Sequence, residues 1–195
     1  MTESVDIFRN AIDAESLAVS IKALPEAQQI AFEKCTVSDY SGKPIGDAEE
    51  LIRSLDQPVH IVNGVVVPAA FTDAEIRGMS VNRLAFINQN DALRLAFDRV
   101  AAVNQRKTLE AERQGVQPSS PQRKTVAFTT FKTSELRAVM SCKGVGARRG
   151  LGVYDTAKVD DHSHGDIFLL LADRQAKRSI RSEWFALANK ALIHL

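Results

Sequence analysis

The sequence predicts an α+β fold, in which a small, mainly antiparallel sheet is packed with helices and preceded by an N-terminal helical segment. Three observations favour this class. Helical and strand patterns do not alternate along the chain as they do in βαβ units. Asn63-Gly64 joins two β-branched runs, which is the strongest short-range signal of a β-hairpin. The segment from Asp173 onward has the apolar periodicity of an amphipathic helix.

The 195 residues are enough for one domain, which we expect to consist of a helical part (1–56) and an α+β core (57–195). The first part has two helical stripes, and Asp13 lies between them, either capping a second helix or standing inside a continuous one. Pro25 opens another turn of helix. The segment 47–55 is predicted as a further helix, with Asp47 as its N-cap and glutamates in its first turn.

The core is predicted to begin with the hairpin over 59–67, followed by a strand over 79–87 and a long helix that starts at Asn90 or Asp91 and reaches Gln114. Residues 113–124 contain two prolines and are predicted as a flexible loop. The remaining predicted elements are a strand over 125–131, a short helix over 133–140, strands over 151–154 and 166–171, and a final helix whose apolar face includes Trp184. We expect the helices to pack on one face of the sheet and the N-terminal helices to cover an end or edge.

Composition gives few functional constraints. The formal net charge of +1 provides no bulk attraction to nucleic acid or to an acidic membrane, so such binding would need a local patch. Two cysteines, Cys35 and Cys142, stand far apart in no metal-binding spacing, which is typical of a reducing compartment. The acidic N-terminus lacks a signal-peptide pattern, and no apolar run is long enough to span a bilayer. We therefore expect a cytoplasmic protein without a membrane partner.

The stretch Gly144–Phe168 concentrates the residues with chemical potential. Its glycines miss the dinucleotide fingerprint by one residue, and a helix precedes them where a strand is required. A match to the short-chain dehydrogenase motifs, including Tyr154 and Lys158, is excluded because the two motifs are adjacent instead of far apart.

Lys143, Arg148 and Arg149 remain as candidates for a phosphate or nucleic-acid site, since exposed backbone N–H groups and guanidinium groups can hold phosphate. The alternative is a connector with solvated charges. Arg83, near Arg77, is a candidate for a second basic patch.

Two histidines in the segment DDHSHGD offer a different chemistry. On a strand, His162 and His164 would point the same way and could share a divalent metal with Asp166 as the third ligand. The segment does not match the common metal-hydrolase or phosphoesterase patterns. The alternatives are a polar turn that enters a strand, or a catalytic His164 that acts without a metal.

Several short segments together resemble a loose group of small bacterial proteins with no known activity. They are VPAAF (67–71), MSVNR (79–83), FKTSELR (131–137) and GVYDTAKVDDHSHGDIF (152–168). The chain has Gly165 where that group usually has alanine. The resemblance implies no cofactor or mechanism. It does imply that five residues from these segments lie together, namely Phe71, Ser80, Arg83, Arg137 and His164.

Three hypotheses for function follow. The first is a noncatalytic accessory module of a bacterial multiprotein system, which contacts phosphate or nucleic acid through the glycine- and arginine-rich loop. The second is a small hydrolase or nucleotide-processing enzyme that uses His164 as a base or metal ligand. The third is a protein-interaction subunit, either a homo-oligomer or the partner of a larger protein, with the N-terminal helices as its interface.

Overall fold

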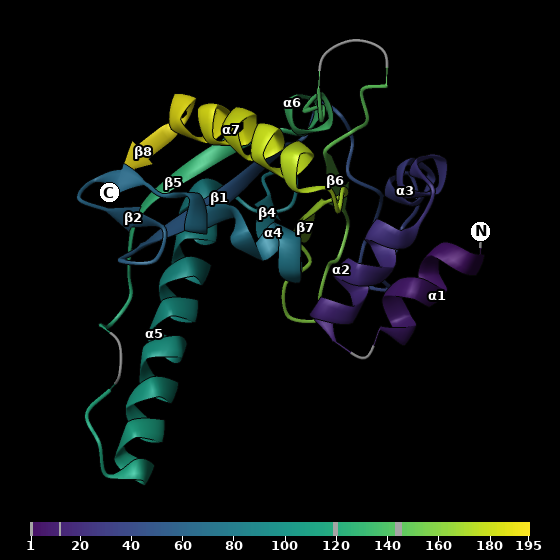
Figure 1. The fold of residues 1–195 in the computed structure, drawn as a ribbon. Coiled ribbons are helices and arrows are strands. Elements are labelled where there is room, and N and C mark those ends of the chain that lie inside the picture. Colours follow the sequence, from purple (N-terminus) through teal and green to yellow (C-terminus); the bar gives the residue numbers. More distant parts are fainter. Residues whose placement is uncertain (1, 12, 119–120, 143–145) are drawn as a thin grey trace.

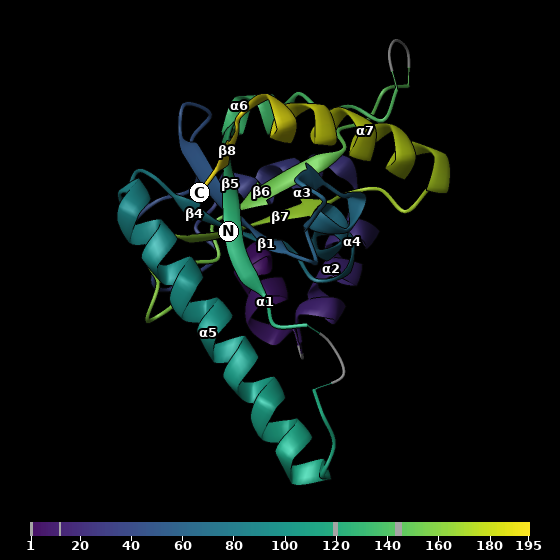
Figure 2. The ribbon, with the colours of Figure 1, turned by 90° about the vertical axis from the view of Figure 1, so that its left-hand side faces the viewer.

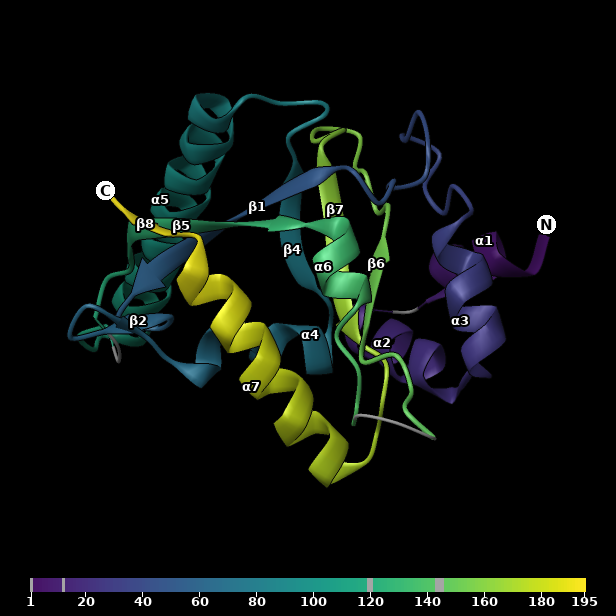
Figure 3. The ribbon, with the colours of Figure 1, turned by 90° about the horizontal axis from the view of Figure 1, so that it is seen from above.

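The computed structural model describes residues 2–11, 13–118, 121–142 and 146–195. A six-stranded antiparallel sheet carries helices on both faces (Figures 1 and 3), which confirms the α+β class. The strands are β1 (Glu50–Gln57), β4 (Met79–Arg83), β5 (Lys124–Lys132), β6 (Leu151–Tyr154), β7 (His164–Leu169) and β8 (Leu192–His194), in the order β6-β7-β4-β1-β5-β8. The helices are α1 (Thr2–Asn10), α2 (Ala14–Ala23), α3 (Glu26–Glu33), the 3₁₀ turn η1 (Pro68–Phe71), α4 (Thr72–Ile76), α5 (Gln89–Gln114), α6 (Thr133–Arg137) and α7 (Arg174–Lys190).

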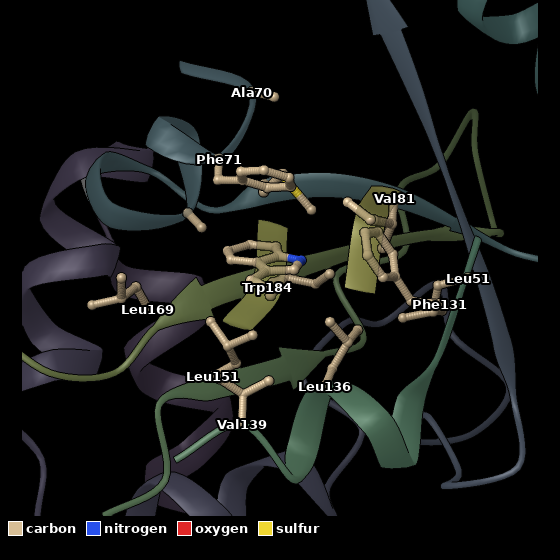
Figure 4. Packing of buried hydrophobic residues seen from close by; sticks show 14 of the residues in the cluster. Leu51, Ala70, Phe71, Val81, Phe131, Leu136, Val139, Leu151, Leu169 and Trp184 are labelled. Atoms are coloured by element: carbon tan, nitrogen blue, oxygen red, sulfur yellow. The ribbon is translucent and has the colours of Figure 1, made fainter. Parts of the chain in front are cut away.

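The largest hydrophobic core lies between α7 and one face of the sheet. Trp184 of α7 is fully buried in its middle, with Phe71 on one side and Leu151 on the other (Figure 4). The rings of Trp184 and Phe71 lie 4.8 Å apart between centroids. The prediction that Trp184 is a core residue is therefore confirmed.

The opposite face of the sheet is covered in two places. The first half of α5 packs Ala92 against Ile52 and Phe128 of the central strands. Further along, α5 extends past the sheet and away from the rest of the protein (Figures 1 and 2). At the other end of the same face, α1–α3 pack on β6 and β7 around Tyr154 and Phe168. Helices thus cover both faces, and the expectation of a single covered face was wrong.

A strip of polar side chains separates these two covered regions. Asn82 on β4 stands between Ile52 on β1 and His164 on β7 in the strand register, so all three share the α5 face of the sheet. Ser80 pairs with Asp166 in the same way. Ser80, Asn82, His164 and Asp166 form what we call the polar strip.

The predicted helix over 47–55 does not form, which is a correction: residues 47–49 lie in a turn and its end, and residues 50–55 belong to the central strand β1. Residues 50–57 pair with β5 along their whole length and with β4 at Leu51 and Ile52. Leu51 and Leu55 enter the α7 core, whereas Ile52 enters the α5 core. A central strand that is buried on both faces loses the strict alternation of apolar and polar residues, so its sequence pattern can be mistaken for that of a short amphipathic helix.

The hairpin turn forms as predicted, but its place in the fold differs. Asn63 and Gly64 both take positive φ, of 52° and 77°, as this turn type requires. The strands that they join, β2 (Ile61–Val62) and β3 (Val65–Val66), form a separate two-stranded ribbon outside the six-stranded sheet. The prediction that the main sheet contains this hairpin was wrong.

Several boundaries also differ from the sequence predictions. Asp13 caps α2, so the N-terminal helical segment is interrupted there. Of the two alternatives for Asp13, the cap of a second helix is confirmed. Asn88 caps α5, and β8 follows α7 as a strand that the sequence pattern did not indicate. Among the described residues, no helix has the length and apolar character needed to cross a membrane.

Candidate functional site

Arg149, a predicted phosphate ligand, is engaged within the protein. Its Nη2 lies 2.7 Å from Glu33 Oε1, and its Nε donates to the carbonyl of Leu151 at 2.9 Å. Its side chain is 11% exposed. Burial raises the pKa of Glu33, and Arg149 and Arg137 oppose that shift by stabilising the ionised carboxylate. Arg149 therefore fastens β6 to α3 and has little capacity left for a ligand.

The glycines of the same stretch serve close packing. A Cβ on Gly150 would lie 2.6 Å from Ile180 Cγ1, and one on Gly152 would lie 2.7 Å from Tyr154 Cε2. Both positions therefore need glycine so that α7 and a neighbouring ring can approach the backbone. Lys143, the third predicted cation of this loop, lies outside the described residues.

Arg83, the candidate for a second basic patch, is fully buried. Its guanidinium donates two parallel hydrogen bonds of 2.9 Å to Glu49 and lies 3.3 Å from Asp155 Oδ1. It also donates to the carbonyl of Lys43 and stacks on the ring of Phe86. Burial raises the pKa of Asp155 to about 6, although Arg83 acts in the opposite direction. The arrangement is an internal ion-pair network in which no donor is left for solvent.

The five residues expected to lie together do so only in part. Arg83 and Arg137 both hold the loop before β1, since Arg137 donates to the carbonyl of Ile45 and to Asp47. His164 and Ser80 lie on the polar strip, and Phe71 lies in the α7 core.

His164 is held with one ring nitrogen directed at the backbone. Its Nδ1 lies 3.0 Å from both the carbonyl oxygen and Oγ1 of Thr156. The hydroxyl of Thr156 donates to Asp166 Oδ2 at 2.8 Å, so both oxygens near Nδ1 can act as acceptors and the ring proton belongs on Nδ1. Nε2 is buried, lies 3.9 Å from Asp166 Oδ1, and has no hydrogen-bond partner in the part of the chain that the structure describes. Nε2 is therefore the acceptor nitrogen of the His164 ring, and it is buried.

The proposed metal ligands do not converge. His162 precedes β7, is exposed, and has its Nδ1 2.9 Å from the carbonyl of Tyr40. Among the described residues, no group of three or more His, Cys, Asp or Glu side chains is placed to hold a metal ion. His162, His164 and Asp166 thus gain no support as a divalent-metal site.

Thr156 and Asp166 line a cavity of about 530 Å³ beside the polar strip. Its other walls come from α1, α2, the loop over 37–40 and the connection between β6 and β7. Nearby, Asn82 donates to Asp161 and to Ser163, a cluster that the sequence did not single out. Residues separated by about 80 positions meet here only because β4 pairs with β7.

The basic surface lies mainly on α7, where sequence reasoning had considered only the apolar face. Arg174, Lys177, Arg178 and Arg181 have i, i+3, i+4 and i+7 spacing and therefore share one flank of the helix. We call these four residues the basic flank. Among the residues described, no carboxylate contacts Arg174 or Arg178, and both are exposed. The spacing was readable in the sequence.

One carboxylate faces three cations at the middle of the basic flank. Glu75 of α4 forms ion pairs with Lys177 and Arg181, and its backbone carbonyl accepts from Lys22 of α2. Burial alone would raise the pKa of Glu75, but the hydrogen bond from Lys177 and the charges of Arg181, Lys177 and Lys22 outweigh it and lower that pKa. Burial and the charge of Lys177 lower the pKa of Lys22. Positive charge is thus in local excess.

Arg148 extends this surface beyond α7. Arg148 and Lys22 line a cavity of about 260 Å³, together with Ser141 and with Asp173 at the start of α7. The side chain of Arg148 is 49% exposed, and its Nε lies 3.6 Å from Glu26. Of the two predicted cations of the loop that the structure describes, Arg148 is the one placed toward solvent with a capacity for a ligand.

Comparison with known proteins adds no assignment, because no family model, no curated protein and no solved structure matches the chain.

Proposed function

We propose that this protein is a noncatalytic accessory module that binds nucleic acid through the basic flank of α7 and Arg148. The observation that carries the proposal is the concentration of cations on one surface. The cations are Lys22, Arg148, Arg174, Lys177, Arg178 and Arg181. The carboxylates that contact them or share their cavity are Glu26, Glu75 and Asp173.

Counted over the described residues, six cations and three carboxylates give this surface a formal charge of +3, whereas the chain as a whole carries +1, which leaves −2 for all other residues. A nearly neutral protein with one strongly basic face binds a polyanion in a defined orientation, because the rest of its surface repels phosphate. Phosphate contacts of this kind depend on salt and not on sequence.

Charge reversal at Arg148 and Arg174 tests the proposal. Both side chains are exposed and outside the hydrophobic cores, so Arg148→Glu with Arg174→Glu should leave the fold intact. We expect affinity for a fluorescein-labelled 20-nucleotide single strand to fall about tenfold or more at 50 mM salt. The slope of log affinity against log salt should decrease by about 1.4, the value for two lost phosphate contacts. Fluorescence anisotropy measures both.

The matched control reverses the same charge elsewhere. Arg106 and Arg113 are exposed on the distal part of α5, away from the basic flank (Figure 1). Arg106→Glu with Arg113→Glu should keep the wild-type affinity and salt slope. The proposal fails if wild-type protein does not bind the strand at 50 mM salt, or if both double variants lose affinity equally.

A specific observation favours a second candidate, a nucleotide-processing or phosphoester-hydrolysing activity with His164 as general base. Its Nε2 is the acceptor nitrogen of the ring and lies 3.9 Å from Asp166 Oδ1. Asp166 lines the largest of the cavities described above. We expect turnover of nucleoside phosphates, followed by ³¹P NMR, to fall roughly 100-fold or more in His164→Gln. His162→Gln, two positions away and exposed, should keep wild-type activity. Absence of turnover in wild-type protein, or equal rates in both variants, would remove this candidate.

The third hypothesis, a protein-interaction subunit that uses the N-terminal helices, stays a prediction. The structure does show that Ile21 of α2 and Phe32 of α3 are buried against β6 and β7. Much of the apolar surface of these helices is therefore already used within the chain.

A further inference from the structure

A second cavity lies at the C-terminal part of the basic flank. It has a volume of about 300 Å³ and lies between η1 and α7. Its lining residues are Pro68, Phe71, Arg178, Arg181, Ser182 and Phe185. The four residues from α7 have the same i, i+3, i+4, i+7 spacing as the basic flank, so cavity and flank are continuous along the helix.

The lining combines aromatic rings with guanidinium groups. The half-buried Phe185 supplies ring surface, Phe71 closes the cavity from the α7 core with only 1% of its surface exposed, and Arg178 has no carboxylate partner among the described residues. Arg181 gives one terminal nitrogen to Glu75, while its buried Nε has no hydrogen-bond partner among the residues described. Aromatic rings stack on the flat face of a nucleobase, and arginine both stacks on bases and pairs with phosphate.

We propose that this cavity takes an unpaired nucleobase, and hence that the ligand of the basic flank is a single strand. The inference rests on the proposed function. A cavity of this size is at the small end of the range for ligand pockets and suits one planar ring system. A base inside a duplex would have to leave its stack first, which costs a few kcal/mol. The neighbouring phosphates then lie along the flank toward Arg174 and Arg148.

A strand that lacks bases distinguishes the contribution of base stacking to the affinity from the contribution of phosphate charge. Wild-type protein is titrated with a labelled 12-nucleotide single strand, with the same backbone carrying abasic sites, and with the corresponding duplex. We expect the normal strand to bind roughly 5- to 100-fold more tightly than the abasic strand. It should also bind more tightly than the duplex.

Two variants assign the effect to this cavity. Phe185→Leu keeps an apolar side chain but removes the ring, and Ser182→Leu fills the cavity from an exposed helix position. Either variant should bring the affinity for the normal strand down to that for the abasic strand. Phe97→Leu, on an exposed face of α5, is the control and should change nothing. Circular dichroism shows whether each variant is folded. If Phe185→Leu does not fold, Ser182→Leu still provides the test.

The outcomes separate the two proposals. If normal and abasic strands bind equally, or the duplex binds as tightly as the single strand, the base pocket is overturned. In that case a loss of affinity in Arg148→Glu with Arg174→Glu would still support nucleic-acid binding. If no strand binds wild-type protein at 50 mM salt, both proposals are overturned.

Discussion

Replacement of Arg83 by methionine is expected to lower the free energy of unfolding by about 3–5 kcal/mol, the usual cost of breaking a buried ion pair by removing one partner. Methionine fills much of the space of the arginine stem, so the loss comes mainly from charge. Glu49 and Asp155 would lose the guanidinium that now compensates them. Urea unfolding followed by circular dichroism measures the change.

The effect of the Arg83 substitution should depend on pH. Asp155 already has a pKa raised to about 6, and without Arg83 its ionised form is still less favourable. At pH 5 the carboxyl is largely protonated and needs no partner, whereas at pH 8 it is charged and buried. The destabilisation should therefore be larger at pH 8 than at pH 5, which unfolding at the two pH values tests.

A surface arginine gives the reference for this experiment. Arg94 is 72% exposed and pairs with Asp91 one helical turn away, so Arg94→Met should cost less than about 1 kcal/mol. A loss below about 1 kcal/mol in Arg83→Met as well would show that the network around Glu49 and Asp155 is not a buried ion-pair system.

Truncation of Trp184 to alanine is the second large expected effect, at about 3–5 kcal/mol. The indole is fully buried between η1, α6 and the sheet, and it contacts the rings of Phe71 and Phe131 (Figure 4). Alanine would leave a cavity that these neighbours cannot fill without moving α7. Thermal and urea unfolding by circular dichroism measure the loss.

Trp184→Phe is the matched comparison. The indole Nε1 is buried without a hydrogen-bond partner in the described structure, so phenylalanine removes an unsatisfied donor while it keeps an aromatic ring. We expect a far smaller loss than for alanine. Equal losses in both variants would contradict the packing assigned to this core.

The fold class could be predicted from the sequence because turns and buried helix faces are set by the local residue pattern, and that pattern was strong. Asn63-Gly64 takes positive φ as predicted, and Trp184 lies on the buried face of its helix. The segment 47–55 was misread because residues buried on both faces of a sheet lose the alternation that marks a strand. The separate position of the hairpin depends on tertiary packing, since Ile61 and Val66 are buried in the α7 core, and no local pattern reports this packing.

The candidate site was predictable only in part, for a related reason. Arg83 and Arg149 have the residue type of phosphate ligands, but carboxylates distant in the chain occupy them, namely Glu49 and Glu33. The partners of a charged side chain are set by tertiary structure, so a cluster of basic residues in sequence does not establish a free basic surface. By contrast, the basic flank follows from helix periodicity alone, and attention to the polar side of the final helix would have found it.

The strand order has a consequence for the kinetics of folding. Glu50 pairs with Lys132 and Met79 with Ile167, so the β1–β5 and β4–β7 pairings join positions more than 80 residues apart in the chain. Among the described strands of the main sheet, β6 pairs with β7 and β1 pairs with β4 as consecutive strands, whereas β1–β5 and β4–β7 are not consecutive. The entropy of closing these long loops must be lost before the central pairings can compensate for it. The chain should therefore fold slowly for its size, on the millisecond-to-second scale that is typical of folds dominated by distant contacts.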